Sequence, residues 1–202
     1  MTAEPAVALR DAAAELTRLR KRFAVVGGLA VSIRAEVRFT RDVDLAVDVQ
    51  DDEETESLVR ELGARSYQVI ARVEHEAAGR LATVRLRAPS QVTVDLLTAS
   101  SGIERELVAR ATPVAIEDVG TLPVASPEDL LATKILAMDA RRLQDHLDAR
   151  KLLEMNPDLD LDRVRDDLRL IEARGYHREQ DLQAKLRTVL EEVGPPPAPR
   201  EP

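Results

Sequence analysis

The chain has 202 residues and a formal net charge of −8; 44% of its residues are hydrophobic and 33% are charged. This length and apolar content are enough for one large domain or two small ones. The acidic balance is unsuited to general nucleic-acid binding, and an aromatic content of 2% without tryptophan argues against a base-stacking surface. Since the sequence contains no cysteine, a disulfide framework and a thiolate site are excluded.

The sequence has no apolar run long enough to cross a membrane and no signal-peptide pattern at its N-terminus. We therefore expect a cytoplasmic protein without a membrane partner. The three histidines, His75, His146 and His177, are far apart and lack zinc-ligand spacing, so we expect them on the surface.

Apolar periodicity predicts that helices and strands alternate as far as residue 124. We expect helices over residues 6–20, 29–36, 51–63 and 103–110. We expect strands over residues 23–26, 42–49, 67–73, 81–87 and 91–97, with one or two edge strands within 113–124. The pattern predicts an α+β fold whose small mixed β-sheet is flanked by helices.

A glycine pair and two aspartates stand out in this part of the chain. Gly27-Gly28 ends the first expected strand, where a backbone without Cβ atoms can approach a phosphate and the next helix can offer its N–H groups. Asp42 and Asp44, two residues apart on a strand, point to the same face. Close carboxylates repel unless a cation neutralises them, and Mg²⁺ takes such ligands together with substrate phosphates.

Each of these features alone also fits an ordinary turn or a solvated strand face. Their coincidence in one strand–helix–strand unit favours a metal-dependent nucleoside-triphosphate site, with Thr40 and Arg41 placed to contact phosphate oxygens.

Asp95 is a third candidate carboxylate. It lies on the polar side of an expected strand whose other side is filled by Val92, Val94 and Leu96. An exposed aspartate near a strand end is the simpler interpretation. If this strand pairs beside the strand of Asp44, Asp95 completes a second metal site or accepts the proton of an incoming hydroxyl.

From Ser126 onward the sequence is helical in character. Ser126-Pro127 is typical of an N-cap followed by proline at the first helical position. We therefore expect a sheet domain over residues 1–124, a helical domain over 125–193 and a disordered Pro-rich tail over 194–202.

Lys134 lies among apolar neighbours in the first of these helices, which is an unusual place for a lysine. If that helix continues, Arg141, Asp145 and Asp148 share its face. Spacing alone also fits a lysine that extends to solvent while Asp145 pairs with Arg141 or Arg142.

The first cluster carries a resemblance to a known family. Gly27-Gly28 followed by Arg38-x-Thr40-x-Asp42-x-Asp44 resembles the first motif of the polymerase-β-like nucleotidyltransferases, and most closely that of the AbiEii/MenT toxin group. Gly28 stands where many members have serine, which removes one hydroxyl that contacts phosphate. Asp95 matches the third acidic residue of this fold.

The helical part carries the rest of the resemblance. Lys134-x-x-Ala137-x-x-x-Arg141, followed by Asp145, resembles the third and fourth motifs of the same group. The resemblance covers roughly residues 22–155.

This resemblance implies a Mg²⁺- or Mn²⁺-dependent enzyme that transfers a nucleotide from a nucleoside triphosphate to an acceptor hydroxyl. It implies metal ligands at Asp42, Asp44 and Asp95, and a catalytic role for Lys134 on the triphosphate. Asp145 would orient Lys134 or assist proton transfer. The implied substrate-binding residues are Gly27, Gly28, Arg38, Thr40, Arg41 and Arg141.

The family likeness further implies the toxin of a toxin–antitoxin pair, acting on tRNA 3′ ends and neutralised by an antitoxin protein. Two alternatives remain open. One is transfer to a small molecule such as an aminoglycoside, which the acidic charge favours. The other is a degenerate nucleotide-binding or antitoxin-like module, against which the retained aspartates and Lys134 argue.

Overall fold

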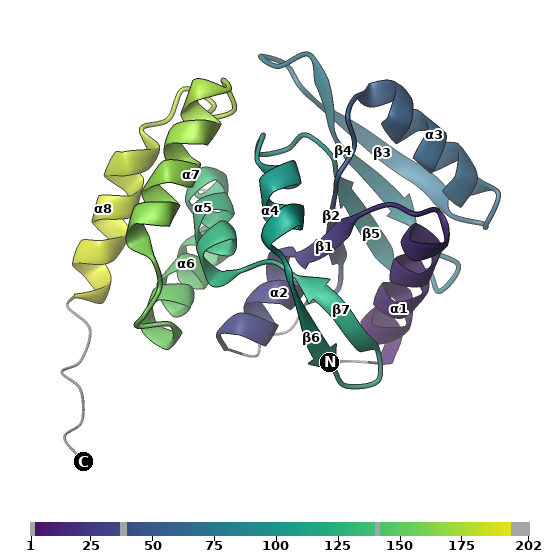
Figure 1. The fold of residues 1–202 in the computed structure, drawn as a ribbon, viewed down its shortest axis with the longest axis horizontal. Helices are drawn as coiled ribbons and strands as arrows, with labels where there is room; N and C mark the ends of the chain where they lie inside the picture. Colours follow the sequence, from purple (N-terminus) through teal and green to yellow (C-terminus); the bar gives the residue numbers. More distant parts are fainter. Residues whose placement is uncertain (1–2, 37–39, 140–141, 195–202) are drawn as a thin grey trace.

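The computed structural model describes residues 3–36, 40–139 and 142–194. The described chain contains a seven-stranded mixed sheet in the order β3-β4-β5-β2-β1-β7-β6 (Figure 1). Its strands are β1 (Phe23–Val26), β2 (Val43–Val47), β3 (Gln68–His75), β4 (Arg80–Arg87), β5 (Thr93–Leu97), β6 (Thr112–Ile116) and β7 (Gly120–Val124).

The centre of the sheet is the strand β2, which pairs antiparallel with β1 and parallel with β5. On the outer sides, β7 runs parallel to β1, and β4 runs antiparallel to both β5 and β3. Val43, Leu45 and Val47 of β2 are fully buried. An apolar strand at this position is expected because a central strand is covered on its faces by other elements.

Four helices pack around the sheet: α1 (Ala3–Arg18), α2 (Gly27–Arg34), α3 (Asp52–Gly63) and α4 (Glu104–Arg110). α1 packs on β2 and β5, α3 on β3 and β4, and α4 on β1 and β2. The side chain of Asp51 caps α3 by accepting a hydrogen bond from the amide of Glu54 at 2.8 Å. The predicted order of helices and strands in this part of the chain is confirmed, with changes of a few residues at their ends.

The last four helices lie together beside the sheet (Figure 1): α5 (Pro127–Ala137), α6 (Leu143–Met155), α7 (Leu161–Ala173) and α8 (Leu182–Val193). Ser126 caps α5, as predicted, because its hydroxyl accepts a hydrogen bond from the amide of Asp129 at 3.2 Å. The predicted α+β fold with C-terminal helices is confirmed.

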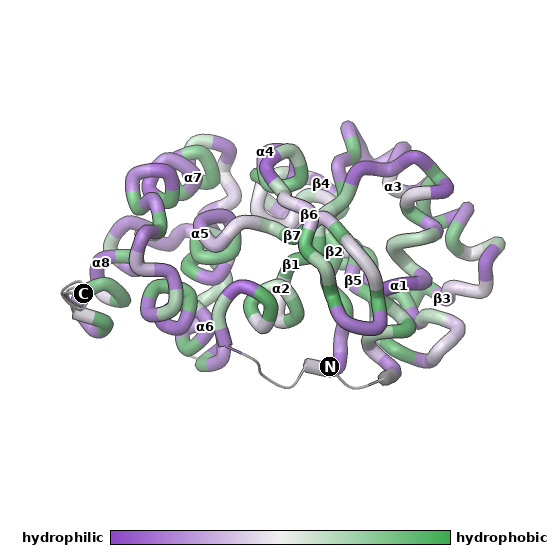
Figure 2. The backbone as a smooth tube through the Cα atoms, turned by 60° about the horizontal axis from the view of Figure 1, so that its bottom comes forward, coloured by the Kyte–Doolittle hydropathy of each residue, from purple (hydrophilic) through white to green (hydrophobic). Residues whose placement is uncertain are grey.

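One core of buried apolar residues runs from the sheet into these helices. Figure 2 shows hydrophobic residues along β1, β2 and α2 in the middle of the molecule and more hydrophilic stretches on α3 and α7 toward the outside. Because the core is continuous, the division at residues 124 and 125 into two domains stays a prediction.

A network of ion pairs ties α4 to the C-terminal helices. Arg110 on α4 contacts the carboxylates of Asp129 on α5 and Asp167 on α7, the latter at 2.9 Å. Asp129 is fully buried and also accepts hydrogen bonds from Ser126 at 2.7 Å and Arg163 at 2.9 Å. The buried carboxylate is therefore paired, as burial requires.

The expectation that all histidines lie on the surface is wrong for His75, which is only 8% exposed. β3 extends past the predicted end at Val73 and brings the His75 ring to 4.5 Å from that of Tyr176. Tyr176 comes from the segment between α7 and α8, so a neighbour distant in sequence covers the imidazole. Among the described helices, none has the length and apolar character of a membrane-crossing segment.

Candidate active site

The turn after β1 brings the first residues of α2 against Asp44. α2 begins at Gly27, whose φ of +61° is a conformation that side chains with a Cβ rarely adopt. A Cβ on Gly27 would lie 2.0 Å from Oδ2 of Asp44. The amide of Gly28 donates a hydrogen bond to the same carboxylate. Position 27 therefore requires glycine, and the helix start faces a negative group, as helix dipoles favour.

Asp44 and Asp95 are direct partners in the parallel pairing of β2 with β5. Neighbouring strands lie about 4.8 Å apart, so the two carboxylates project side by side. Asp95 is buried and Asp44 is partly buried, whereas Asp42 lies exposed just before β2. The pairing that was predicted to bring Asp95 beside Asp44 is present in the structure.

The carboxyl group of Asp44 is poorly neutralised by the protein. Burial raises its pKa to about 6, and repulsion from Asp95 and then Asp42 adds to the shift. Lys134 and the Gly28 amide act in the opposite direction without cancelling it. A divalent cation relieves this kind of repulsion, and carboxylates with phosphate oxygens are the ligands that Mg²⁺ prefers. Asp42 and Asp44 thus fit a magnesium site.

Asp95 is held by Arg85 of the neighbouring strand β4. Nε of Arg85 donates to Oδ1 at 2.9 Å and Nη2 donates to Oδ2 at 2.6 Å. Within the described part of the chain, no three Asp, Glu, His or Cys side chains are arranged to hold a metal ion together. The guanidinium on Asp95 is consistent with this, because it engages both oxygens of the third carboxylate.

Lys134 on α5 is buried and paired with two carboxylates of α6. Its Nζ lies 2.7 Å from Oδ1 of Asp145 and 2.8 Å from Oδ2 of Asp148. Oδ2 of Asp145 also lies 3.8 Å from Nη1 of Arg142. Asp145 therefore contacts both Lys134 and Arg142, two partners that the sequence analysis considered for it. Asp148 is only 2% exposed, and sequence reasoning did not assign it to the site.

The sequence left open whether the helix of Lys134 continues to Asp148, and in the structure it does not. α5 ends at Ala137 and α6 begins at Leu143. Lys185 of α8 stabilises this ending because its ammonium group donates to the backbone carbonyls of Ile135 and Met138. The break lets α6 pack against α5, which brings the α6 carboxylates to Lys134 from a second helix.

Only some of the predicted substrate-binding residues line the cleft. Gly27 lines the cleft that contains the carboxylates. Thr40 donates a hydrogen bond to the backbone carbonyl of Asp42 at 3.4 Å, and Arg41 is exposed; neither is among the described residues that line the cleft. Arg38 and Arg141 lie outside the described residues.

The cleft has a volume of about 840 Å³ and gathers all five predicted catalytic residues. Its lining includes Asp42, Asp44, Asp95, Lys134 and Asp145. The sheet forms one side, and α5 with the segment between α7 and α8 forms another.

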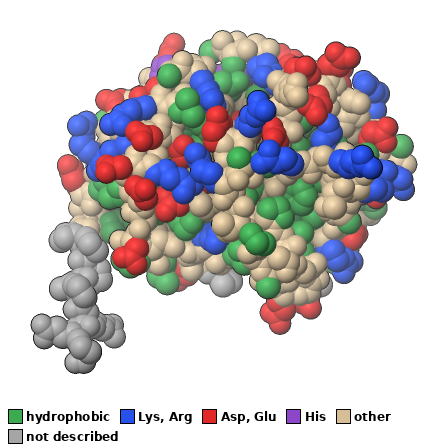
Figure 3. Space-filling view, in the orientation of Figure 1, with side chains coloured by type: hydrophobic (Ala, Val, Ile, Leu, Met, Phe, Trp, Pro, Cys, Tyr) green, Lys and Arg blue, Asp and Glu red, His purple; other side chains and the backbone are tan. Residues whose placement is uncertain are grey.

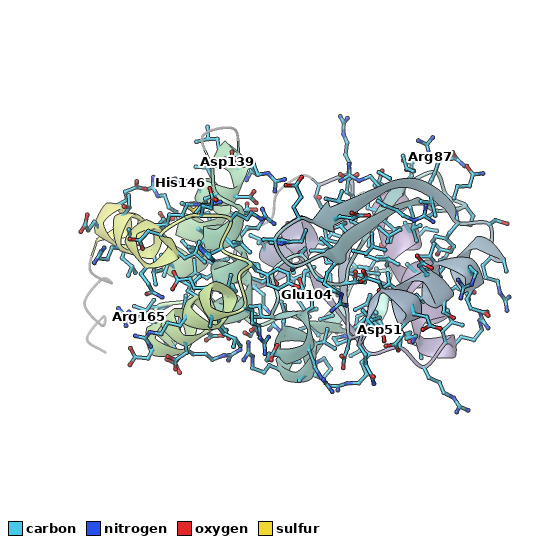
Figure 4. The ribbon with its side chains drawn as sticks, turned by 90° about the horizontal axis from the view of Figure 1, so that it is seen from above. Asp51, Arg87, Glu104, Asp139, His146 and Arg165 are labelled. Atoms are coloured by element: carbon cyan, nitrogen blue, oxygen red, sulfur yellow. The ribbon has the colours of Figure 1, made fainter. Side chains whose placement is uncertain are left out.

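Sequence reasoning missed several lining residues, among them His75, Ser100, Glu104 and Arg178. Glu104 lies between the strands and the C-terminal helices (Figure 4). Its carboxylate accepts hydrogen bonds from the amides of Ser100 and Ser101 at 2.8 and 2.6 Å. Serines just before an acidic helix start are a capping signal that the sequence does contain; for His75 and Arg178 no such local signal exists.

The fold resembles that of known nucleotidyltransferases. The structure resembles an antigenic nucleotidyltransferase-like protein from Paracoccidioides brasiliensis with a TM-score of 0.51 and 21% identity, covering 92% of this chain and 93% of that one. It resembles the antibiotic-resistance factor ANT(2″)-Ia with a TM-score of 0.53 and 15% identity, covering 93% and 97%. At these identities the likeness concerns the fold alone.

The family follows from the sequence itself. The profile of the nucleotidyl transferase AbiEii toxin family of type IV toxin–antitoxin systems matches residues 9–201. The chain belongs to this family, and it is a nucleotidyltransferase enzyme. The resemblance seen in its motifs is thereby confirmed. No curated protein sequence matches the chain.

Proposed function

We propose that this enzyme transfers a nucleotide from a nucleoside triphosphate to the 3′-terminal hydroxyl of a tRNA, with Mg²⁺ or Mn²⁺ as cofactor. The observation that carries the proposal is the pairing of Asp44 with Asp95 beneath the Gly27 turn, next to a cleft large enough for a nucleotide. Membership of a type IV toxin family supports the RNA acceptor and a partner antitoxin.

Each group of the site has a part in this reaction. Asp42 and Asp44 would hold the divalent cation, which neutralises the triphosphate and stabilises the attacking and leaving oxygens. The Gly27 turn leaves room for a phosphate near the first amides of α2. Asp95 lies where it can accept the proton of the attacking hydroxyl or join in binding a second cation.

Lys134 would act on the triphosphate as a fixed positive charge. Its two partners, Asp145 and Asp148, hold the ammonium group at the wall of the cleft. Lys134 lowers the pKa of Asp44, which indicates that its charge reaches the carboxylate pair. Asp145 and Asp148 thus orient Lys134 rather than the substrate.

A small cationic acceptor is the second candidate, and one observation favours it. The cleft is also lined by Glu74, Glu76 and Glu179, which form no part of the metal site. These carboxylates would attract an amine-bearing acceptor and repel a nucleic-acid backbone. On the face seen in Figure 3, Lys and Arg side chains are intermixed with Asp and Glu, so neither sign dominates there.

Incubation with each of the four radiolabelled nucleoside triphosphates tests the proposal. The acceptors are purified tRNA, tRNA with an oxidised 3′ end, and a panel of aminoglycosides. We expect Mg²⁺-dependent labelling of intact tRNA and none of oxidised tRNA, and no labelling by Asp44→Asn. Labelling of an aminoglycoside instead of tRNA would support the second candidate. Absence of labelling on every acceptor by a folded, metal-loaded enzyme would contradict both.

A further inference from the structure

The guanidinium of Arg85 covers Asp95 on the floor of the cleft. Both oxygens of Asp95 accept hydrogen bonds from this one side chain, at 2.9 and 2.6 Å. The two residues are direct partners in the antiparallel pairing of β4 with β5, so the contact follows from the register of the sheet. A bidentate contact of this kind is among the stronger ion pairs in proteins.

The two partners differ in their freedom to move. The side chain of Asp95 is 8% exposed, whereas that of Arg85 is 49% exposed. Asp95 is short and fixed by its strand. Arg85 has several rotatable bonds and borders the open cleft, so it can leave the carboxylate by a change of rotamer while β4 stays in place.

Arg85 also stands where a cation is needed. The hydrogen bonds to Asp95 are the main cause that raises the pKa of Arg85, and the charges of Asp95, Asp42 and Asp44 act in the same direction. All three carboxylates therefore interact favourably with this one guanidinium. Among the described residues, no three His, Cys, Asp or Glu side chains form a group that could hold a metal ion.

From this geometry we propose that Arg85 is the resident counter-ion of Asp95, and that a second divalent cation, the one that Asp95 joins in binding, enters between Asp44 and Asp95 only in exchange for the Arg85 guanidinium. The proposal rests on the proposed function because it concerns the metal site of that reaction. It adds a residue that neither the family motifs nor the sequence analysis assigned to metal binding.

The released guanidinium has a partner in the same cleft. Arginine binds phosphate oxygens with the same two-pronged geometry that it uses for carboxylates. A bound triphosphate would therefore favour the exchange by pairing with Arg85. By linkage, nucleotide should then strengthen cation binding more in the wild type than in a variant without the guanidinium.

Binding of Mn²⁺, measured by the electron paramagnetic resonance signal of the free ion, tests the exchange without turnover. We compare the wild type with Arg85→Gln, first without nucleotide and then with a non-hydrolysable nucleoside triphosphate analogue. Without nucleotide, Arg85→Gln should bind Mn²⁺ tighter by on the order of fivefold, because the competing cation is gone. After subtraction of the Mn²⁺ that the analogue binds without protein, the analogue should strengthen Mn²⁺ binding less in this variant than in the wild type.

Arg87→Gln is the matched control. Arg87 lies two residues further along β4, on the same face and exposed, but it does not line the cleft. Figure 4 shows it on the side of the molecule away from the C-terminal helices. This substitution removes the same charge and should leave Mn²⁺ binding unchanged. Adding Asp95→Asn to Arg85→Gln should abolish the gain, because the proposed ligand is then missing.

Equal or weaker Mn²⁺ binding by a folded Arg85→Gln, relative to the wild type, would overturn the exchange and leave Arg85 as a support for Asp95. If Arg85→Gln does not fold, Arg85→Lys replaces it and should give a smaller gain, since one contact remains. Failure of the proposed function is distinguishable: with the nucleotide analogue present, the wild type would then bind no Mn²⁺ beyond what the analogue binds without protein.

Discussion

Gly27 and Asp44 are in such close contact that only glycine fits at position 27. A Cβ there would lie 2.0 Å from Oδ2 of Asp44, and the backbone has a φ of +61°. Gly27→Ala must therefore displace Asp44 and strain the turn at the same time. We expect transfer activity to fall at least about a hundredfold, since a catalytic group misplaced by about 1 Å costs this much. Initial rates with saturating nucleotide measure the loss.

Gly63→Ala is the control for this substitution. Gly63 ends α3 and does not line the cleft, and a Cβ added to it would meet no other atom within 4 Å. We expect full activity and a stability equal to or up to about 1 kcal/mol above the wild type, as for glycine replaced in a helix. Normal activity in Gly27→Ala would contradict the role given to the close contact.

Gly27 and Asp44 each belong to the part of the site that local sequence patterns could place, although their direct contact was not predicted. The strand, the turn and the alternation around Asp44 are local patterns with a fixed period, and they place each residue on a face. The position of Asp95 needed one further step, the pairing of its strand with β2. The alternation along its strand placed the Asp95 carboxylate on the polar face, and the rules of sheet topology leave few strands with which that strand could pair.

The pH dependence of stability should report on Asp44. Its pKa is raised to about 6 in the folded protein, mainly by burial. The folded state then holds a proton that the unfolded chain releases near pH 4, so stability without metal falls as pH rises from about 4 to 6 and stays low above that. Asp44→Asn removes this effect.

Urea unfolding in EDTA at two pH values measures the difference. At pH 7.5, Asp44→Asn should be more stable than the wild type by on the order of 2 kcal/mol, and at pH 4 the two should be nearly equal. Addition of Mg²⁺ should stabilise the wild type only. A stability gain that is the same at both pH values would show that charge is not its cause.

Lys134 should matter for both stability and activity, and two substitutions separate these roles. Lys134→Met removes the ammonium group that pairs with Asp145 and with the buried Asp148, which should cost about 3 kcal/mol of unfolding free energy. Lys134→Met with Asp148→Asn removes the buried charge and should recover a large part of this loss. Neither protein should transfer nucleotide.

Urea unfolding and the labelling assay, run on both variants, provide the two readouts. Recovery of activity together with stability in the double variant would mean that Lys134 has only a structural role. Loss of activity with recovered stability is the result we expect, because the ammonium group acts on the triphosphate.

Local sequence patterns could not predict the contacts between residues that are far apart in the chain. The helix of Lys134 ends at Ala137, where Lys185, about 50 residues further on, binds the carbonyls at the end of α5. The two hydrogen bonds from Arg85 to Asp95 depend on the register of the sheet. Burial of His75 likewise depends on Tyr176. Tertiary contacts of this kind override local propensity.

From the ion pairs of Arg110 we predict how the two halves of the chain unfold. Arg110 on α4 joins the carboxylates of Asp129 and Asp167, which are 0% and 3% exposed, and one apolar core spans both halves. We therefore expect a single unfolding transition in the wild type. Arg110→Met leaves two buried carboxylates short of their shared cation and should cost about 3 kcal/mol.

Amide hydrogen exchange shows which helices and strands are destabilised by Arg110→Met. In Arg110→Met, protection should fall in α4, α5 and α7, where the network lies, and remain in β3 and β4 at the other side of the sheet. Arg60→Met is the control and should change little, because the Arg60 side chain is exposed on α3 and lies 4.0 Å from Glu56. Two separate transitions in the wild type would contradict the coupling and would instead favour independent domains divided near residue 124.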